Sequence, residues 1–408
     1  ALVFAACVLL ARAAARARTS LEAVLVLPLA WTGFEWILAS FSPHGTFGSL
    51  AYSQMNFLPA LQMAALVGHV GITFLVALAS SGLAFAWHLR RQPRRAAATL
   101  GTAALVVGLS LGWGAARLRD RAPGPALRVG LAAADSTIRW FRTLAPDTTL
   151  AIVRGCTERI DRLAASGARL VVLPEKIVGV PDAAADSALA LLRRAAERNR
   201  ITIVAGFNRR SARFARNIAW VVSRGGVATY DKAHPVPGFE DDYEIGREPL
   251  VLADRTPRLG VAICKDMDFP DWTLRYARRG VDVLAVPAWD FGEDGWLHSR
   301  MAILRGVEGG FSVARCAQDG RLTLSDPFGH VTAEQASSDA PEVLVTGSVP
   351  AIGIVTPLRE GWGLGWVLGL AGLFVACPLR LPRGSRAAAA SGESRPPAIA
   401  SPEIEEEL

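Results

Sequence analysis

Long apolar stretches, separated by short arginine-rich segments, fill the N-terminal part of this chain. Leu21–Phe41, Leu58–Trp87 and Ala96–Ala116 carry few or no charges, and Ala1–Leu10 has the pattern of the end of one more stretch. A helix needs about 20 apolar residues to cross a bilayer, so these stretches favour transmembrane helices. Trp362–Cys377 predicts a further membrane helix near the C-terminus.

The pattern leaves two other interpretations open. The stretches could form buried core helices of a soluble protein, although they exceed the usual length of helices in globular domains. Ala1–Leu10 could belong to a cleavable signal peptide, but the three stretches that follow it would then stay unexplained. A transmembrane region accounts for more of the pattern than either alternative.

Arginine clusters follow the apolar stretches and predict their orientation. The clusters are Arg12, Arg16 and Arg18, then Arg90, Arg91, Arg94 and Arg95, and finally Arg380, Arg383 and Arg386. By contrast, Ser42–Phe57 contains no Lys, Arg, Asp or Glu. Because basic loops tend to stay on the cytoplasmic side, we expect the clusters to be cytoplasmic and Ser42–Phe57 to be outside. Counting the crossings then places Leu118–Glu360 outside as well.

After a break at Pro123–Pro125 the pattern changes to short apolar runs that alternate with helical patterns. The expected strands include Leu127–Ala132, Leu170–Leu173, Ile201–Ala205, Leu259–Ile263 and Val281–Val286, and the expected helices include Leu150–Ala165 and Ala184–Arg198. Ile218–Val222 and Val227–Tyr230 predict a hairpin around Gly225 and Gly226. This alternation predicts an α/β domain of layered sheets with outer helices.

Composition and charge agree with a membrane-attached protein. Hydrophobic residues make up 51% of the 408 positions, mean hydropathy is +0.28, and the net charge is +7. The positive charge comes largely from the arginine clusters, and the middle of the chain has no basic stripe with interleaved aromatic residues. Nucleic-acid binding is therefore not expected. The tail ends in Glu405, Glu406 and Glu407, which predicts a solvated, disordered end.

Only three of the 44 basic residues are lysine, and each lies in or beside a candidate catalytic segment. They are Lys176 in LPEK, Lys232 in YDKAHPVP and Lys265 in ICKD. An ammonium group is a compact charge that a planar guanidinium cannot replace in a tight site. The five widely spaced cysteines form no CxxC pattern, so we expect no metal site.

Three residues at expected strand ends form a plausible site for covalent catalysis. Cys264 would be the nucleophile, Glu175 the base that takes its proton, and Lys232 the donor that stabilises the oxyanion. The backbone N–H of Lys265 is a second candidate donor for the oxyanion. Each residue alone also has an ordinary structural explanation: a strand-end cysteine is more often packing, and Glu175 or Lys232 could be a surface charge.

The segments LPEK, GFNRR, YDKAHPVPGFE and ICKDMDFP, in this order, resemble the nitrilase (carbon–nitrogen hydrolase) superfamily over roughly Ala126 to Val349. The resemblance implies a nitrilase-like αββα sandwich and a Glu–Lys–Cys triad at Glu175, Lys232 and Cys264. It also implies that Glu240 is an auxiliary carboxylate that orients Lys232 or assists proton transfer, although a solvated charge in the acidic run Glu240–Asp242 is an equally simple interpretation. No cofactor is implied.

The apolar part narrows the resemblance. Three segments resemble the apolipoprotein N-acyltransferase family: WTGFEWILASF, LAYSQMNFLPALQMAALVGHVGITFLVAL and, later in the chain, HSRMAILRGVEGGFSVARCAQDGRLTLSDPFGHV. This implies a bacterial inner-membrane enzyme with a periplasmic catalytic domain. It would move a fatty acyl chain from a phospholipid donor to the α-amino group of a diacylglyceryl-cysteine lipoprotein acceptor. The family has an aromatic residue and Glu after the nucleophile, where this chain has Lys265 and Asp266.

Together these arguments predict four parts. They are a transmembrane helical region over residues 1–122, a nitrilase-like catalytic domain over 123–355, one C-terminal transmembrane helix over 356–380 and a disordered cytoplasmic tail over 381–408. Two rival functions stay open. The first is a membrane-anchored amidase or nitrilase, which the amidase-like run Asp266–Pro270 favours. The second is a catalytically silent protein that binds lipid in a groove of the domain.

Overall fold

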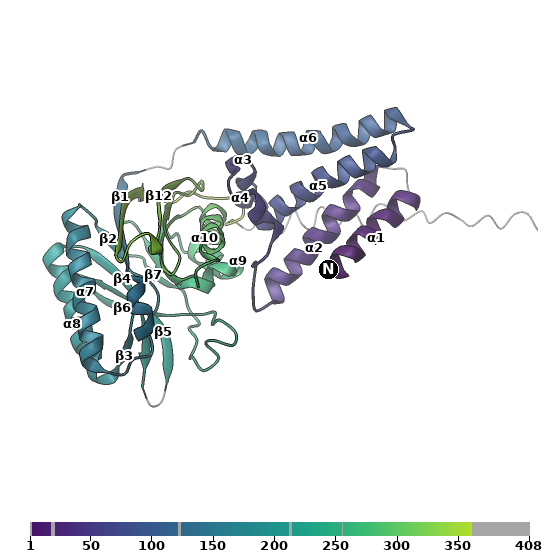
Figure 1. Ribbon diagram of the computed structural model, residues 1–408. Helices are drawn as coiled ribbons and strands as arrows, with labels where there is room; N and C mark the ends of the chain where they lie inside the picture. The colour runs from purple at the N-terminus through teal and green to yellow at the C-terminus, as the bar shows by residue number, and fades with distance from the viewer. Residues whose placement is uncertain (1, 18–20, 121–123, 212–213, 255, 361–408) are drawn as a thin grey trace, which may run out of the picture.

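A computed structural model gives the structure of this chain and describes residues 2–17, 21–120, 124–211, 214–254 and 256–360 (Figure 1). The predicted C-terminal membrane helix over 356–380 and the predicted tail over 381–408 lie almost wholly outside these residues. The N-terminal part is helical. Its elements are α1 (Leu2–Ala17), η1 (Leu21–Leu25), α2 (Val26–Phe41), η2 (Leu50–Gln54), α3 (Leu58–Leu61), α4 (Ala64–Val67), α5 (His69–His88) and α6 (Pro93–Arg117).

Within the described residues, three helices are long and apolar enough to cross a membrane: Ala23–Phe41, His69–His88 and Pro93–Arg117. They expose large apolar side chains, among them Phe41, Leu83, Trp87, Leu105 and Leu109. Such a surface on a soluble protein would be an aggregation hazard, whereas lipid covers it naturally.

The prediction of one continuous membrane run over Leu58–Trp87 is wrong. The chain breaks at Gly68, whose φ of +78° lies in the left-handed region that glycine adopts without strain. The residues before the break form the two short helices α3 and α4, and only α5 is long enough to span a bilayer. Hydropathy alone missed the break because all three segments are apolar.

The middle of the chain forms two sheets. The first has the order β13-β1-β2-β4-β5-β6, with β3 beside β4, and the second has the order β12-β11-β10-β9-β8-β7. The strands of the first are β1 (Ala126–Ala133), β2 (Leu170–Val172), β3 (Gly179–Pro181), β4 (Thr202–Arg210), β5 (Ala215–Ser223), β6 (Gly226–Asp231) and β13 (Val343–Pro350). The strands of the second are β7 (Leu250–Leu252), β8 (Leu259–Val261), β9 (Val283–Trp289), β10 (Ser312–Gln318), β11 (Arg321–Ser325) and β12 (Val331–Ala336).

Two layers of helix cover the outer faces of the sheets. On the first sheet, α7 (Pro146–Ala165) and α8 (Asp182–Asn199) lie side by side, and Val153, Ile160 and Leu192 pack on its buried strands (Figure 1). On the second sheet lie α9 (Pro270–Arg278) and α10 (Gly295–Gly309). Apolar residues of the two inner faces share one core. The predicted nitrilase-like αββα sandwich is therefore confirmed, as is the hairpin of β5 and β6.

Helix α10 joins the sandwich to the N-terminal helices. Met301, Leu304 and Val307 of this helix share a buried apolar cluster with residues of η2, α3, α4 and α5. At the break in the helical run, the backbone N–H of His69 donates to Glu308 at 2.8 Å. The helical region is thus packed directly on the sandwich.

Candidate functional site

Three strand ends on one edge of the sandwich carry the residues that the sequence singled out. Glu175 follows β2, Lys232 follows β6, and Cys264 follows β8. β2 and β4 run parallel, and β6 returns through β5 to the same direction, so their carboxyl ends share an edge. All three side chains are buried, at 3%, 3% and 9% exposure. The structure thus brings together residues that lie far apart along the chain.

Lys232 lies between two carboxylates. Its Nζ is 2.8 Å from Glu175 Oε1 and 2.9 Å from Glu240 Oε2. Asn217 of β5 bridges the same pair, because its Nδ2 donates to Glu175 at 2.5 Å and to Glu240 at 2.8 Å. Glu240 is only 1% exposed, which excludes its interpretation as a solvated charge of the acidic run.

Cys264 begins the short helix η4 (Cys264–Asp268) with φ of +43°, a conformation that residues with a side chain rarely adopt. Its Sγ lies 3.3 Å from the carbonyl oxygen of Trp289. The backbone N–H of Glu175 donates to the adjacent carbonyl of Ala288 at 3.2 Å. The end of β9 therefore contacts both the thiol and the backbone of Glu175.

The charges of this cluster set its protonation state. Although burial lowers the pKa of Lys232, the carboxylates of Glu175 and Glu240 raise it well above its ordinary value. Burial raises the pKa of Glu240, but Lys232 and then Lys176 outweigh it and lower this pKa to about 2. Burial, and after it the charge of Glu175, raise the pKa of the Cys264 thiol well above its ordinary value. These shifts favour a neutral thiol near the ammonium of Lys232 and the carboxylate of Glu240.

Lys265 lies beside the nucleophile position but not in the charged cluster. Its Nζ pairs with Asp268 at 3.1 Å, within η4. The neighbouring Asp266 is fully buried and accepts hydrogen bonds from the Tyr230 hydroxyl and from the backbone N–H groups of Ala233 and Ile263. Asp266 thus connects two segments by hydrogen bonds: the turn that contains Cys264 and the segment that follows Lys232.

A cavity of about 150 Å³ opens at Cys264. Its lining combines Lys265, Asp268, Trp289 and Arg315 of the sandwich with His44 and Phe47 of the N-terminal region. Thr46 anchors this loop, since both its backbone N–H and its hydroxyl donate to the carbonyl of Asp268 at 2.9 Å. The site therefore lies where the helical region meets the sandwich.

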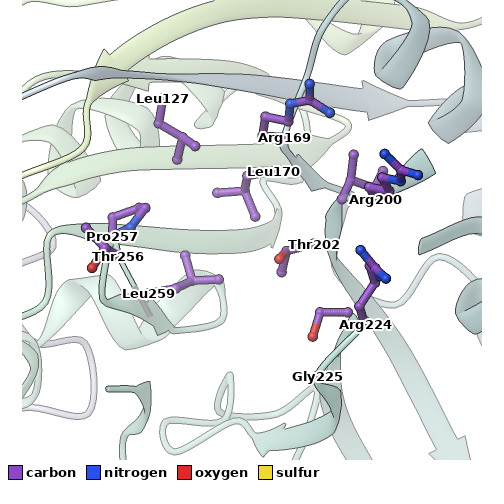
Figure 2. A pocket seen from close by; sticks show the side chains of 12 residues that line it. Leu127, Arg169, Leu170, Arg200, Thr202, Arg224, Gly225, Thr256, Pro257 and Leu259 are labelled. Carbon is purple, nitrogen blue, oxygen red and sulfur yellow. The ribbon is translucent and has the colours of Figure 1, made fainter. Parts of the chain in front are cut away.

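A larger cavity, of about 450 Å³, lies at the opposite ends of the strands (Figure 2). Leu127, Leu170 and Leu259 line one side of it, and the arginines Arg169, Arg200 and Arg224 line the other. It includes the first residues of β2, β4 and β8, whereas Glu175 and Cys264 follow the last residues of β2 and β8. This cavity therefore takes no part in the thiol site.

Sequence reasoning missed two members of the cluster. Asn217 lies inside β5, where an asparagine in an apolar strand was the only signal. Lys176 was visible as one of three lysines, but its contact with Glu240 was not expected. Among the described residues, no group of three or more His, Cys, Asp or Glu side chains could hold a metal ion.

Comparison with known families matches both halves of the chain. The sequence profile of the carbon-nitrogen hydrolase family matches residues 131–343, and that of the apolipoprotein N-acyltransferase N-terminal domain matches residues 1–82. An apolipoprotein N-acyltransferase of Geobacter metallireducens is 26% identical over 344 residues, which cover 76% of this chain and 65% of the relative. An apolipoprotein N-acyltransferase of Azotobacter vinelandii is 29% identical over 394 residues, which cover 88% of this chain and 71% of the relative.

Solved structures support the fold. An amidase of the nitrilase superfamily from Nesterenkonia AN1 superposes with a TM-score of 0.50 at 20% identity, over 62% of this chain and all of the amidase. At this identity the likeness concerns the fold alone. The chain spans slightly less than two thirds of the length of the Geobacter relative.

Proposed function

From the premise that this chain belongs to the carbon–nitrogen hydrolase family, we propose that it is a membrane-bound N-acyltransferase. Its acyl donor would be a phospholipid, and its acceptor the N-terminal amine of a diacylglyceryl-cysteine lipoprotein. The observation that carries the proposal is the placement of Cys264. This thiol lines one pocket with His44 and Phe47 of the apolar helical region, and the charges of the Glu175–Lys232 pair act on it.

The first half-reaction forms a thioester. Cys264 Sγ attacks the ester carbonyl of the donor while its proton passes to Glu175, which is required because burial keeps the thiol protonated at rest. The ammonium of Lys232 and the backbone N–H of Lys265 donate to the developing oxyanion. The C–O bond then breaks, the lysophospholipid leaves with the proton from Glu175, and the acyl group remains on sulfur.

The second half-reaction returns the enzyme to its resting state. The acceptor amine attacks the thioester carbonyl, and Glu175 takes the proton that the amine loses. The C–S bond breaks, and the departing thiolate of Cys264 regains a proton from Glu175. An amide is formed, no water is consumed, and no cofactor is needed.

The position of the cavity supports a lipid donor. Phe47 and Phe291, which line it, are large and partly exposed, at 45% and 46%. The adjacent helix α2 exposes Trp36 and Phe41. With the arginine clusters inside, the orientation of these helices would put the sandwich in the periplasm at the inner membrane.

Acyl transfer is tested with the full chain in phospholipid vesicles and a synthetic diacylated lipopeptide. We expect the lipopeptide to gain the mass of one acyl chain, with an equal amount of lysophospholipid. Cys264→Ala should abolish the gain, whereas Cys156→Ala should keep it, because Cys156 lies on the buried face of α7, in the core of the sandwich. Transfer by the Cys264→Ala variant would refute the mechanism.

A second candidate function is amide hydrolysis, which the amidase-like run Asp266–Pro270 favours. In this case Cys264 would form a thioester from a small amide, ammonia would leave, and water would resolve the intermediate. Release of ammonia from a small amide, with no mass gain on the lipopeptide, would identify the protein as a membrane-anchored amidase.

A further inference from the structure

Lys176 occupies an unusual position for a lysine. It directly follows Glu175, its φ of +49° lies in the left-handed region, and its side chain is 1% exposed. Bringing an ammonium group out of water is costly unless a partner compensates its charge. A lysine held here in a rarely adopted backbone conformation therefore needs an explanation from its contacts.

The contacts of Lys176 point at one carboxylate. Its ammonium pairs with Glu240 Oε1, the oxygen that Lys232 does not contact. The aromatic rings of Phe239 and Tyr243 lie 4.7 and 4.6 Å from Nζ, and ring faces attract cations. Glu240 thus has a cation on each oxygen.

The charges of the buried cluster cancel in pairs. Glu175 and Glu240 contribute two negative charges, and Lys232 and Lys176 contribute two positive ones. The Asp290–Arg315 pair, which also acts on Cys264, adds one charge of each sign. Burial lowers the pKa of Lys176, and the carboxylates of Glu175 and Glu240 oppose this. Without Lys176 the cluster would carry one surplus negative charge beside a thiol that must lose its proton. A surplus negative charge disfavours the thiolate.

We propose that Lys176 is a positioning residue that neutralises Glu240, so that the thiol site stays electrically balanced and the Lys232 ammonium stays available to Glu175 and the oxyanion. The proposal rests on the proposed role of Cys264 as the nucleophile. It assigns no contact with substrate to Lys176, which acts only through Glu240.

The test is the pH profile of Cys264 alkylation by iodoacetamide, measured by mass spectrometry on the full chain, with the other cysteines resolved as separate peptides. Lys176→Met should move the profile to higher pH. For an assumed separation of ~10 Å and an effective dielectric constant of ~20, one uncompensated charge corresponds to a shift on the order of one pH unit and about tenfold slower alkylation at fixed pH. Glu240→Gln should move the profile in the opposite direction.

The double variant Lys176→Met with Glu240→Gln is the decisive arm. If the two residues act as a charge pair, the double variant should return close to the wild-type profile, because both charges are gone. If Lys176 acts only by packing among the aromatic rings, the double variant should be at least as impaired as the worse single variant. That result would overturn the proposal.

Two further variants control for folding and for general charge. Lys176→Gln removes the charge but keeps a hydrogen-bond donor for Glu240, and it should shift the profile as Lys176→Met does. Arg210→Met removes a nearby cation that pairs with Asp242 and lies over Tyr243, and it should leave the profile unchanged. An equal shift in Arg210→Met, or an unshifted Lys176→Gln, would contradict the proposal.

Alkylation needs neither phospholipid nor lipopeptide, so its outcome is independent of acyl transfer. If the profile shifts as described and no acyl transfer occurs, the role of Lys176 stands and the proposed function fails. If acyl transfer occurs and the profile does not move, the proposed function stands and the role of Lys176 fails.

Discussion

Lys232→Arg tests whether catalysis depends on the position of the donor at Lys232 or only on its positive charge. The wild-type ammonium lies 2.8 Å from Glu175 and 2.9 Å from Glu240 and is 3% exposed. At an effective dielectric constant of ~20, each such pair corresponds to about 6 kcal/mol of Coulomb attraction. Arginine keeps this attraction, so the loss of stability should be limited to overpacking, about 1–3 kcal/mol.

Catalysis should fall much further than stability in Lys232→Arg. The guanidinium is larger and directs its donors differently, so the donor aimed at the oxyanion is lost. Loss of one such donor costs on the order of 100- to 1,000-fold in rate, about 3–4 kcal/mol of transition-state stabilisation. Single-turnover formation of the acyl-enzyme from phospholipid measures this loss.

Lys232→Met provides the comparison, because this substitution also removes the positive charge. The two buried carboxylates then lose their shared cation. Breaking a buried pair in this way costs about 3–5 kcal/mol. Lys232→Met should therefore unfold at a clearly lower temperature than Lys232→Arg, while both form the acyl-enzyme at least about 100-fold more slowly than wild type. Acylation by Lys232→Arg within about threefold of wild type would refute the geometric argument, since the factor of 100 expected is far larger.

Three other variants probe different parts of the account. Glu175→Gln should prevent acyl-enzyme formation, and accumulation of acyl-enzyme in this variant would restrict Glu175 to the second half-reaction. Burial raises the pKa of Glu240, but Lys232 and Lys176 outweigh it and lower this pKa from 4.5 to about 2. The ionised Glu240 therefore stabilises the fold above pH 4.5, and this stabilisation is lost as the pH falls from 4.5 toward 2. Glu240→Gln should therefore lose less stability on acidification, by on the order of 2 kcal/mol, in unfolding curves measured between about pH 6 and about pH 3; equal acid sensitivity would contradict the pairing. Glu35 accepts hydrogen bonds from Ser49, the Leu50 N–H and Thr73. Glu35→Gln should therefore loosen the loop that contains His44 and Phe47. Acyl transfer should slow about tenfold, while the rate of Cys264 alkylation should stay unchanged.

Local patterns were sufficient to predict an α/β domain of layered sheets with outer helices and the strand-end positions of the three candidate residues, and the family resemblance added the αββα sandwich. Strand period, strand length and turn residues are local properties, and parallel strands bring their carboxyl ends to one edge. The meeting of Glu175, Lys232 and Cys264 could therefore be expected from sequence. Their catalytic roles remain a proposal.

Contacts between distant segments could not be predicted in the same way. The left-handed backbone that turns Lys176 toward Glu240 has no signal in the residue type, since lysine is neither glycine nor asparagine. The loop with His44 and Phe47 carries no charge, and nothing local indicates that it reaches Asp268. The break at Gly68 follows from packing on Glu308 and α10 rather than from hydropathy.

The most direct measurement is the intact mass of the purified chain after incubation with phospholipid alone, followed by peptide mapping. The account predicts a single fatty acyl adduct on Cys264 that hydroxylamine removes and that disappears when a diacylated lipopeptide is added. An adduct on Cys156 or Cys316, or no adduct under conditions in which the lipopeptide is acylated, would contradict a thioester at Cys264.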